Sequence, residues 1–479
     1  MYTERAVEVR MMHFDKETLK KLWSGPLAFL LASLILSPLT GWAGALAVGT
    51  AFWMALWWIF RPVHIAVTSM LPIAVNAVCS LIPNSHVIAQ YFTDIVVLLL
   101  GADLICMAWS TTGLDRRISL RAICFIGTSM RQQIFVWLAA SVLMSAFLPN
   151  TVVAAILCPI AAGMLKVTGQ KDIGMSAAAV PILLAIGWGS GIGGFGTPIG
   201  SPANLVAISY IEDLTGHEFM YIEWMRWFVP ILLAVFFVNL AFLWHLPTTV
   251  RQLPGAREAF QRQYQALGPM RPGEKWGFWL FVLAVVLAFI RPLYADLLPG
   301  LKPAYVFLIV GMMMFLLRDE NGRVLLTWKY AESHAIWGIM IMASSGLALG
   351  RLIIETGAVA ELAAYFGHLT LTGGFLTMLF FCAFACLMSE MSSNTGAVSI
   401  CLPLTVSVCQ TLGLPPVPYV IGTIAASSCA YILPVTTRAI PVGYGLDAKV
   451  QMHQGLRLSI LTVLVNTCVC WATMTFLAG

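Results

Sequence analysis

The chain is a succession of long apolar runs joined by short polar connections, starting at Pro26. A helix needs about 20 residues to cross a bilayer. The clearest runs of that kind are 26–40, 43–60, 64–81, 94–110, 227–245, 277–290, 303–317, 334–352 and 456–477. This pattern predicts an all-α polytopic membrane protein with about 11 transmembrane helices once interrupted segments are included.

Four further apolar segments are interrupted near their middle by residues that end helices. The interruptions fall at 148–151, 187–198, 392–396 and 433–438. Non-helical backbone at membrane depth survives only where protein or a wet cavity satisfies its polar groups. We therefore expect two re-entrant hairpins and two broken helices, over 132–165, 374–411, 174–211 and 415–446, respectively.

The two halves of the chain are related by a repeat. A shift of 244 positions aligns Asn150-Thr151 with Asn394-Thr395 and Ser145 with Ser389. Paired interrupted helices in corresponding positions point to the binding site of a secondary transporter. Residues 114–131 carry four arginines, whereas 358–375 carry no lysine or arginine. Positive residues stay cytoplasmic, so we expect inverted repeats; a parallel repeat with accidental charge asymmetry remains the alternative.

The repeat and one hydrophilic stretch suggest a division of the chain. We expect an N-terminal tail with the first scaffold half, a first transport half, a cytoplasmic linker, a second scaffold half and a second transport half. Their bounds are 1–131, 132–246, 247–275, 276–373 and 374–479. The start of the chain does not resemble a signal peptide, so we expect a cytoplasmic N-terminus in a cell (bacterial inner) membrane.

Composition excludes several classes of protein. Only 10% of residues are charged and 59% are hydrophobic, whereas soluble domains carry about 25% charged residues. A soluble enzyme, a disordered chain and a nucleic-acid binder are excluded, and the net charge of +5 does not change this. The chain has no nucleophile–base motif or metal-ligand motif of an enzyme. Its 11 cysteines have no paired spacing, which argues against a disulfide framework.

The interrupted segments carry chemistry suited to ions. A hairpin that turns at Asn-Thr presents a helix N-terminus, which favours anions. The preceding half-helix ends in free carbonyls, and neighbouring Ser and Asn side chains add neutral oxygens that suit Na⁺. Two such tips suit a substrate with a carboxylate at each end. The alternative is that each Asn-Thr pair only caps a helix.

The interrupted segments also resemble those of a known family, the divalent anion/sodium symporter (DASS) family. The motifs are Pro149-Asn150-Thr151, Ser393-Asn394-Thr395, the run from Gly193 to Asn204, and Pro434-Val435-Thr436-Thr437. The resemblance implies a homodimer in which a moving domain carries the substrate across the bilayer past a fixed scaffold, as an elevator. It implies dicarboxylate substrates such as succinate, malate and fumarate, and in some members citrate or sulfate.

From the chemistry and the resemblance we predict two sets of site residues. The substrate set is Asn150, Thr151, Thr197, Asn394, Thr395, Thr437 and Arg438. The Na⁺ candidates are Ser145, Asn150, Gly193, Gly196, Ser389, Ser393 and Asn394. Na⁺ is the expected coupling ion and no other cofactor is expected. The expected partners are a small anion, the bilayer and a second copy of the chain, with no nucleic acid.

Two departures from the family pattern bear on the coupling ion. Pro149 stands where the first tip normally has Ser, and Arg438 stands where the second unwound segment has Pro. Na⁺-coupled symport is the leading prediction. One alternative is a Na⁺-independent dicarboxylate exchanger in which Arg438 replaces a cation, unless Arg438 pairs with Glu390. Another is a transporter of sulfate or another inorganic anion; arsenite or Na⁺/H⁺ antiporters of related architecture are a further rival.

Several other ionisable residues lie within apolar runs. An intramembrane charge is a functional hypothesis by default. For Asp94, Asp103 and Arg351 we nevertheless expect structural ion pairs within the scaffold. His334 is expected at a membrane boundary.

Overall fold

The computed structural model describes residues 16–123, 127–170, 173, 176–358 and 373–477. Over these residues the chain is helical, with two isolated β-bridges and no named strand. Within the described residues, six helices are long and apolar enough to cross a membrane by length and composition. Their bounds are Glu17–Phe60, Asn84–Thr112, Tyr221–Trp244, Pro272–Phe289, Trp337–Glu355 and Ala448–Thr475. The expectation of an all-α polytopic membrane protein is thereby confirmed, while the count of about 11 spans stays a prediction.

In the described residues, the first half of the chain contains ten α-helices and two 3-10 helices up to Thr215. They are α1 (Lys16–Phe60), α2 (Ile65–Thr68), α3 (Leu71–Cys79), α4 (Asn84–Ile88), η1 (Ala89–Phe92), α5 (Asp94–Thr112), α6 (Leu114–Ile123), α7 (Met130–Ser145), α8 (Asn150–Val167), α9 (Ala179–Gly193), η2 (Pro198–Gly200) and α10 (Pro202–Thr215). The helices α11 (Tyr221–Trp244) and α12 (Ala256–Ala266) then lead into the second half.

The second half repeats the alternation of long helices and interrupted ones. It contains α13 (Pro272–Phe289), α14 (Arg291–Tyr294), α15 (Pro303–Met313), α16 (Trp328–His334), α17 (Trp337–Glu355), α19 (Phe375–Met391), α20 (Asn394–Thr411), α21 (Pro416–Ser427), η3 (Thr436–Arg438), α22 (Ala439–Gly443) and α23 (Ala448–Leu477). The segment 358–375, which inverted repeats with a cytoplasmic 114–131 would place outside, lies almost wholly outside the described residues, as does the N-terminal tail before Lys16.

The predicted runs 26–40 and 43–60 are both helical and together form α1, which is interrupted by a kink between them at Gly41. Gly41 has φ 67°, a conformation that glycine adopts at little cost. One expected boundary differs, in the first broken helix, which was expected to unwind from Gly187. Instead α9 continues to Gly193, so the interruption is shorter than the glycine content suggested.

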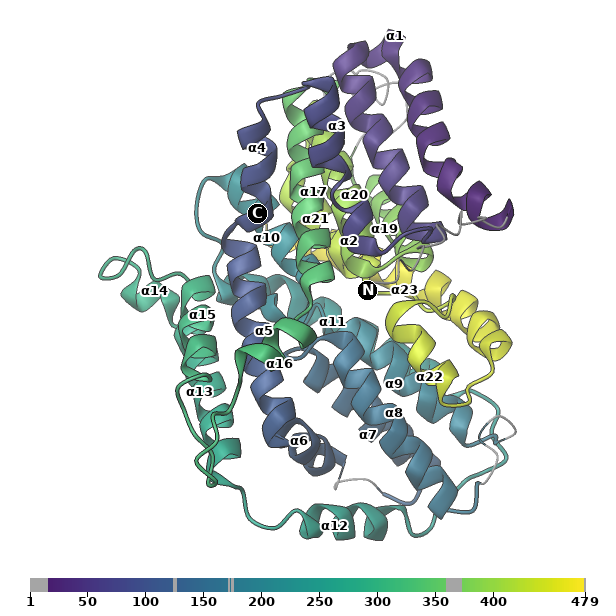
Figure 1. The fold of residues 1–479 in the computed structure, drawn as a ribbon. Helices are drawn as coiled ribbons and strands as arrows, with labels where there is room; N and C mark the ends of the chain where they lie inside the picture. Colours follow the sequence, from purple (N-terminus) through teal and green to yellow (C-terminus); the bar gives the residue numbers. More distant parts are fainter. Residues whose placement is uncertain (1–15, 124–126, 171–172, 174–175, 359–372, 478–479) are drawn as a thin grey trace, which may run out of the picture.

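The interrupted helices gather in two groups (Figure 1). In one, α7 and α8 pack against α9; in the other, α19 and α20 pack against α21, and α20 also packs against α17. The breaks predicted between the helix pairs are confirmed at the level of helix bounds: α7 gives way to α8 at Asn150, and α19 to α20 at Asn394. Both α8 and α20 are 18 residues long, as the repeat requires.

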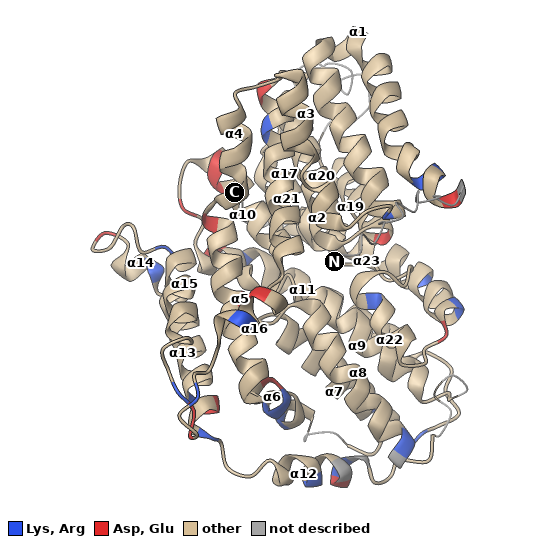
Figure 2. Ribbon diagram, in the orientation of Figure 1, with Lys and Arg blue, Asp and Glu red and all other residues tan. Residues whose placement is uncertain are grey.

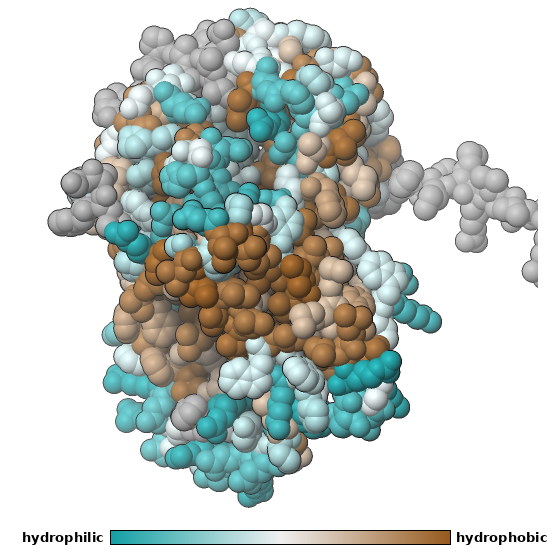
Figure 3. Space-filling model, turned by 90° about the vertical axis from the view of Figure 1, so that its left-hand side faces the viewer, coloured by the Kyte–Doolittle hydropathy of each residue, from teal (hydrophilic) through white to brown (hydrophobic). Residues whose placement is uncertain are grey.

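The distribution of charged and hydrophobic residues over the molecule is the one expected of a protein that spans a bilayer. Lys and Arg gather around α6, α12 and the loop below α15 (Figure 2). The buried Arg117 of α6 forms an ion pair of 3.0 Å with Glu274, which ties this basic region to the end of the linker. The side of the molecule formed by α13 and α15 shows a hydrophobic band between hydrophilic surfaces (Figure 3). Its exposed side chains include Trp279, Ile309 and Met312.

Candidate substrate-binding site

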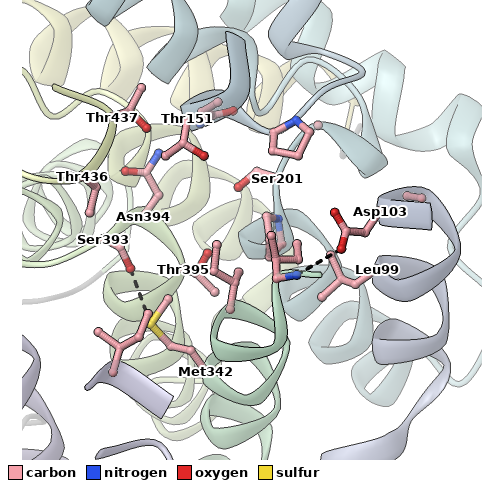
Figure 4. Close-up of a pocket in the computed structure, with 18 of the residues that line it drawn as sticks. Leu99, Asp103, Thr151, Ser201, Met342, Ser393, Asn394, Thr395, Thr436 and Thr437 are labelled. Carbon is pink, nitrogen blue, oxygen red and sulfur yellow. Dashed lines mark hydrogen bonds between the residues drawn. The ribbon is translucent and has the colours of Figure 1, made fainter. Parts of the chain in front are cut away.

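A cavity of about 220 Å³ lies where the interrupted segments of both halves meet. The two hairpin turns, the starts of η2 and α10, and the η3 turn line it on one side, while α5, the end of α1 and the start of α17 line the other (Figure 4). Segments from both halves of the chain therefore share one cavity, and polar side chains form part of its largely apolar lining. Its lining includes Asn150, Thr151, Ser201, Ser392, Ser393, Asn394, Thr395, Thr436 and Thr437.

Both hairpins bring a helix N-terminus to this cavity. α8 begins at Asn150 and α20 begins at Asn394, and both residues line the cavity. The first backbone N–H groups of a helix lack intrahelical partners and carry the positive end of its dipole. At α20, the Ser393 hydroxyl accepts a hydrogen bond from the Gly396 N–H at 3.1 Å. Pro149, at the same position before α8, makes no side-chain cap bond.

One hydrogen bond is repeated behind the two tips. The Ser145 hydroxyl donates to Asn150 Oδ1 at 2.7 Å, and the Ser389 hydroxyl donates to Asn394 Oδ1 at 3.0 Å. Both serines are fully buried. Ser145 also lies 2.7 Å from the Ser190 carbonyl oxygen. The sequence repeat is therefore matched by a repeated contact that fixes each tip asparagine.

The first interrupted helix packs tightly against the first hairpin. Asn204 Nδ2 donates to the carbonyl oxygens of Gly194 and Thr197, at 2.7 and 2.8 Å. A Cβ at Gly194 would lie 2.5 Å from Asn150 Oδ1, and one at Gly193 would lie 2.4 Å from the Val142 carbonyl oxygen. The contact at Gly193 is with backbone, so glycine is required there for close approach, whereas the contact at Gly194 is with the end of the Asn150 side chain.

A buried ion pair holds the second interrupted helix. Arg438 Nη1 lies 2.9 Å from Glu390 Oε2, and Arg438 Nη2 donates to the Ser389 carbonyl oxygen at 2.9 Å. Glu390 also accepts the N–H groups of Ile432 and Leu433, the latter at 3.0 Å, and that of Tyr431. Arg438 is 5% exposed. Its side chain thus points back to the second hairpin, while Thr437 next to it lines the cavity.

The structure brings together most of the predicted substrate residues. Asn150, Thr151, Asn394, Thr395 and Thr437 line the cavity. The other two do not line it. Thr197 is buried and its hydroxyl donates to the Ala146 carbonyl oxygen, whereas Arg438 pairs with Glu390.

The predicted Na⁺ candidates lie in and behind the two tips. Asn150, Ser393 and Asn394 line the cavity, and Ser145 and Ser389 bond the tip asparagines from behind. The two glycines of this set, Gly193 and Gly196, lie at the end of α9 and in the turn after it.

Several residues that line the cavity were not predicted as site residues, among them Asp103, Arg61 and Ser201. Asp103 was interpreted as part of a structural ion pair, which is wrong: its Oδ2 accepts the Ile336 N–H at 3.0 Å, it lines the cavity, and it forms no ion pair with any described residue. Arg61 lines the cavity from the end of α1. Ser201 caps α10 by accepting from the Ala203 N–H at 3.3 Å. The Ser201-Pro202 pair, a typical helix start, was a signal that would have identified it.

The remaining intramembrane charges are placed outside the cavity. Asp94 forms the expected ion pair, with Lys302 at 3.0 Å. Arg351 is exposed and lies 3.9 Å from Glu355 on the same helix, which is a weak surface contact rather than a buried pair. His334 is exposed at the end of α16.

The fold and the cavity together define a polytopic membrane protein of the transporter class, in which two interrupted helix pairs share one site. The chain belongs to the divalent anion/sodium symporter family: a family model described as the sodium:sulfate symporter transmembrane region matches residues 28–477. The family and its relatives are transporters, so the chain is not an enzyme.

Individual relatives support this assignment. The chain is 27% identical over 460 residues to the sodium-dependent dicarboxylate transporter SdcS of Staphylococcus saprophyticus, covering 92% of this chain and 88% of the relative. It is 26% identical over 475 residues to SdcS of Staphylococcus aureus, covering 95% and 91%. The solved structure of the YdaH transporter of Alcanivorax borkumensis is similar in fold, with a TM-score of 0.55, 15% identity, and coverage of 95% and 98%.

Proposed function

We propose that this protein is a secondary active transporter that carries small dicarboxylates, of the succinate, malate and fumarate class, together with Na⁺. The observation that carries the proposal is the meeting of two Asn-Thr helix starts, Asn150-Thr151 and Asn394-Thr395, at one cavity. Each start offers unpaired N–H groups, an amide and a hydroxyl to an anion. A substrate with a carboxylate at each end engages both starts at once.

The relatives' names point in the same direction. Both staphylococcal relatives are named as sodium-dependent dicarboxylate transporters, and they align with nearly the whole of this chain. The family description also mentions sulfate. The two separate anion-binding tips favour a dianion with two separated charges over a compact tetrahedral one.

The donors around the first tip suit Na⁺. Ser145 Oγ and Asn150 Oδ1 are neutral oxygens that lie close to the turn after α9. Asn204 Oδ1, on the residue that binds this turn, is buried and has no hydrogen-bond partner among the described residues. An unsatisfied buried acceptor is costly, and hard cations take oxygen ligands of these kinds. We therefore assign the leading Na⁺ position to the first tip, with Gly193 and Gly196 supplying backbone carbonyls.

At the second tip, Arg438 alters the cation chemistry. Its guanidinium donates a hydrogen bond to the Ser389 carbonyl oxygen. A second Na⁺ would use this oxygen together with Ser389 Oγ, Ser393 and Asn394. Glu390 offsets the charge of Arg438. An unpaired Arg438 would leave the empty carrier with a positive charge, and a counter-anion would then be needed for its return. Because the pair with Glu390 is neutral overall, this need is removed. We therefore favour Na⁺ symport over exchange.

An elevator motion is part of the proposal. The hairpins and interrupted helices, within 132–246 and 374–479, form the moving unit, and α1, α5 and α17 belong to the scaffold halves, 1–131 and 276–373. The cavity lies between lining residues of the two groups, as a site that moves past a fixed wall requires. We further propose inverted repeats, a homodimer in the cell membrane, and a cytoplasmic N-terminus.

Ligand-dependent stability of the purified protein tests the substrate assignment. A ligand that binds only the folded state raises the unfolding temperature. Succinate should do so in NaCl and much less in choline chloride, and butyrate, with one carboxylate, should have little effect. Sulfate matching succinate, or succinate acting equally in both salts, would contradict the assignment.

A further inference from the structure

We propose that Asp103 is a specificity-determining residue that restricts the substrate to two negative charges. This inference rests on the proposed function, because it concerns which anions the same cavity accepts. Asp103 places a carboxylate on the wall of a cavity that is otherwise built to bind anions. Such a charge opposes the main substrate unless the substrate keeps its own charges away from it.

The position of Asp103 separates it from the two tips. It projects from α5 on one side of the cavity, and Asn394, Thr436 and Thr437 lie on the other side (Figure 4). Asp103 Oδ2 accepts the N–H of Ile336, the residue before α17, at 3.0 Å. No hydrogen bond from a described residue reaches Oδ1. Asp103 is 6% exposed, so little water screens its charge.

The surroundings compensate this charge only in part. The N-terminus of α17 carries the equivalent of about half a positive charge. Arg61 is the cation among the residues that line the cavity, and it forms no ion pair of 4 Å or less with Asp103 in the described part of the chain. Within contact distance, and among the described residues, the Asp103 carboxylate is therefore compensated only by this helix end.

This charge separates dicarboxylates from tricarboxylates. A linear dicarboxylate bound at both tips leaves only its carbon chain to face α5. A third carboxylate on a branched substrate has to enter the remaining space, where it meets Asp103. Two like charges about 5 to 6 Å apart in a protein interior repel strongly enough to weaken binding roughly 10- to 100-fold. Sulfate and dicarboxylates escape this penalty, since each carries two charges.

The experiment uses three competitors that differ in one branch. Succinate has no branch, 2-ethylsuccinate has a neutral one, and tricarballylate has a carboxylate at the same place. Each competes with labelled succinate for uptake into proteoliposomes that contain the full-length protein. The ratio of half-inhibitory concentrations, tricarballylate over ethylsuccinate, reports charge discrimination separately from size.

The variants isolate the charge of Asp103. Asp103→Asn keeps the volume and an oxygen to accept the Ile336 N–H, and Asp103→Glu keeps the charge. Asp94→Asn removes a carboxylate of the same helix that pairs with Lys302 outside this cavity. We expect a ratio of roughly 10 to 100 in wild type, at least a tenfold lower ratio in Asp103→Asn, and the wild-type ratio in the other two variants.

The outcomes are distinct. An unchanged ratio in Asp103→Asn overturns the inference, and so does complete loss of succinate uptake in an Asp103→Asn protein that elutes as a folded species, because the carboxylate would then be needed for transport itself. A wild-type protein that takes up no succinate instead overturns the proposed function. The inference is supported if the ratio falls in Asp103→Asn and keeps its wild-type value in Asp103→Glu and Asp94→Asn.

Discussion

Glu390 and Arg438 close the unwound turn of the second interrupted helix. Glu390 accepts successive backbone N–H groups at 431–433, and Arg438 bonds both Glu390 and the Ser389 carbonyl oxygen. Backbone groups freed by an unwound helix have to be satisfied inside the protein. In this turn the ion pair of Glu390 and Arg438 satisfies the backbone groups. Thr436 and Thr437 of the same turn line the cavity.

Breaking this pair should destabilise the protein. Removing one partner of a buried ion pair leaves an uncompensated charge and costs about 3–5 kcal/mol. We expect Arg438→Met to lose about that much unfolding free energy, measured by denaturant titration in mixed micelles. Arg438→Met combined with Glu390→Gln should lose less, and exposed Arg226→Met should change little. Equal stability of Arg438→Met and wild type would argue that the pair does not form.

The tip asparagines should determine substrate affinity. A hydrogen bond to a charged group contributes roughly 1.5–3 kcal/mol, so Asn394→Ala and Asn150→Ala should each weaken succinate binding about 10- to 150-fold. Isothermal titration in NaCl measures this. Asn321→Ala, in an exposed loop, is the control. Wild-type affinity in both tip variants would place the substrate elsewhere.

At the scale of elements, the two hairpins differ in how their second helix begins. Ser393 caps α20 through the Gly396 N–H, whereas Pro149 gives α8 no side-chain cap bond. The proline keeps its carbonyl group but supplies no hydroxyl. The first tip therefore has one oxygen fewer than the second for holding either the helix or a cation.

Restoring that oxygen should strengthen the response to Na⁺. In Pro149→Ser the new hydroxyl matches Ser393, and we expect half-maximal succinate uptake at a lower Na⁺ concentration than in wild type. Pro415, before α21, is also a helix start without a side-chain cap bond and does not line the cavity, so Pro415→Ser controls for the loss of proline itself. An identical Na⁺ dependence in Pro149→Ser and wild type would show that a hydroxyl at position 149 does not bind the cation.

Helix breaks were predictable because Pro, Asn and Ser at a break act locally. The residues that start α8 and α20 do so through backbone groups within a few positions of themselves. The glycines at 187–193 misled the prediction, because glycine serves two purposes that a sequence does not separate. Gly187 and Gly189 lie within α9, where a Cβ would come 2.8 Å from Pro441 Cγ and 2.9 Å from Ser141 Cβ. They allow close packing rather than unwinding.

Side-chain direction at the breaks was not predictable. Thr197 and Arg438 both stand in irregular turns next to cavity residues, and both point away from the cavity. Which way a side chain points in a turn depends on neighbours from distant segments, such as Ala146 for Thr197 and Ser389 for Arg438. Asp103 was misinterpreted for the same reason, because its partner Ile336 is 233 positions away.

Across the whole molecule, the proposed transport mechanism requires a specific topology. Basic residues gather around α6 and α12 (Figure 2), which we place in the cytoplasm. α13 then crosses the bilayer, so the connection after α14 faces outside. In a cysteine-free background, an impermeant thiol reagent applied to intact cells should label Leu297→Cys and spare Arg262→Cys, both at exposed positions. Labelling in the reverse order would refute this topology.

The most direct test of the central claim is transport by the purified protein in proteoliposomes. An inward Na⁺ gradient should drive accumulation of labelled succinate, and accumulation should be absent when choline replaces Na⁺. It should not require dicarboxylate inside the vesicles, because the Arg438–Glu390 pair leaves no fixed charge to be balanced by a returning anion. Uptake that needs internal dicarboxylate and ignores Na⁺ would contradict the account, and so would the absence of succinate uptake under every gradient.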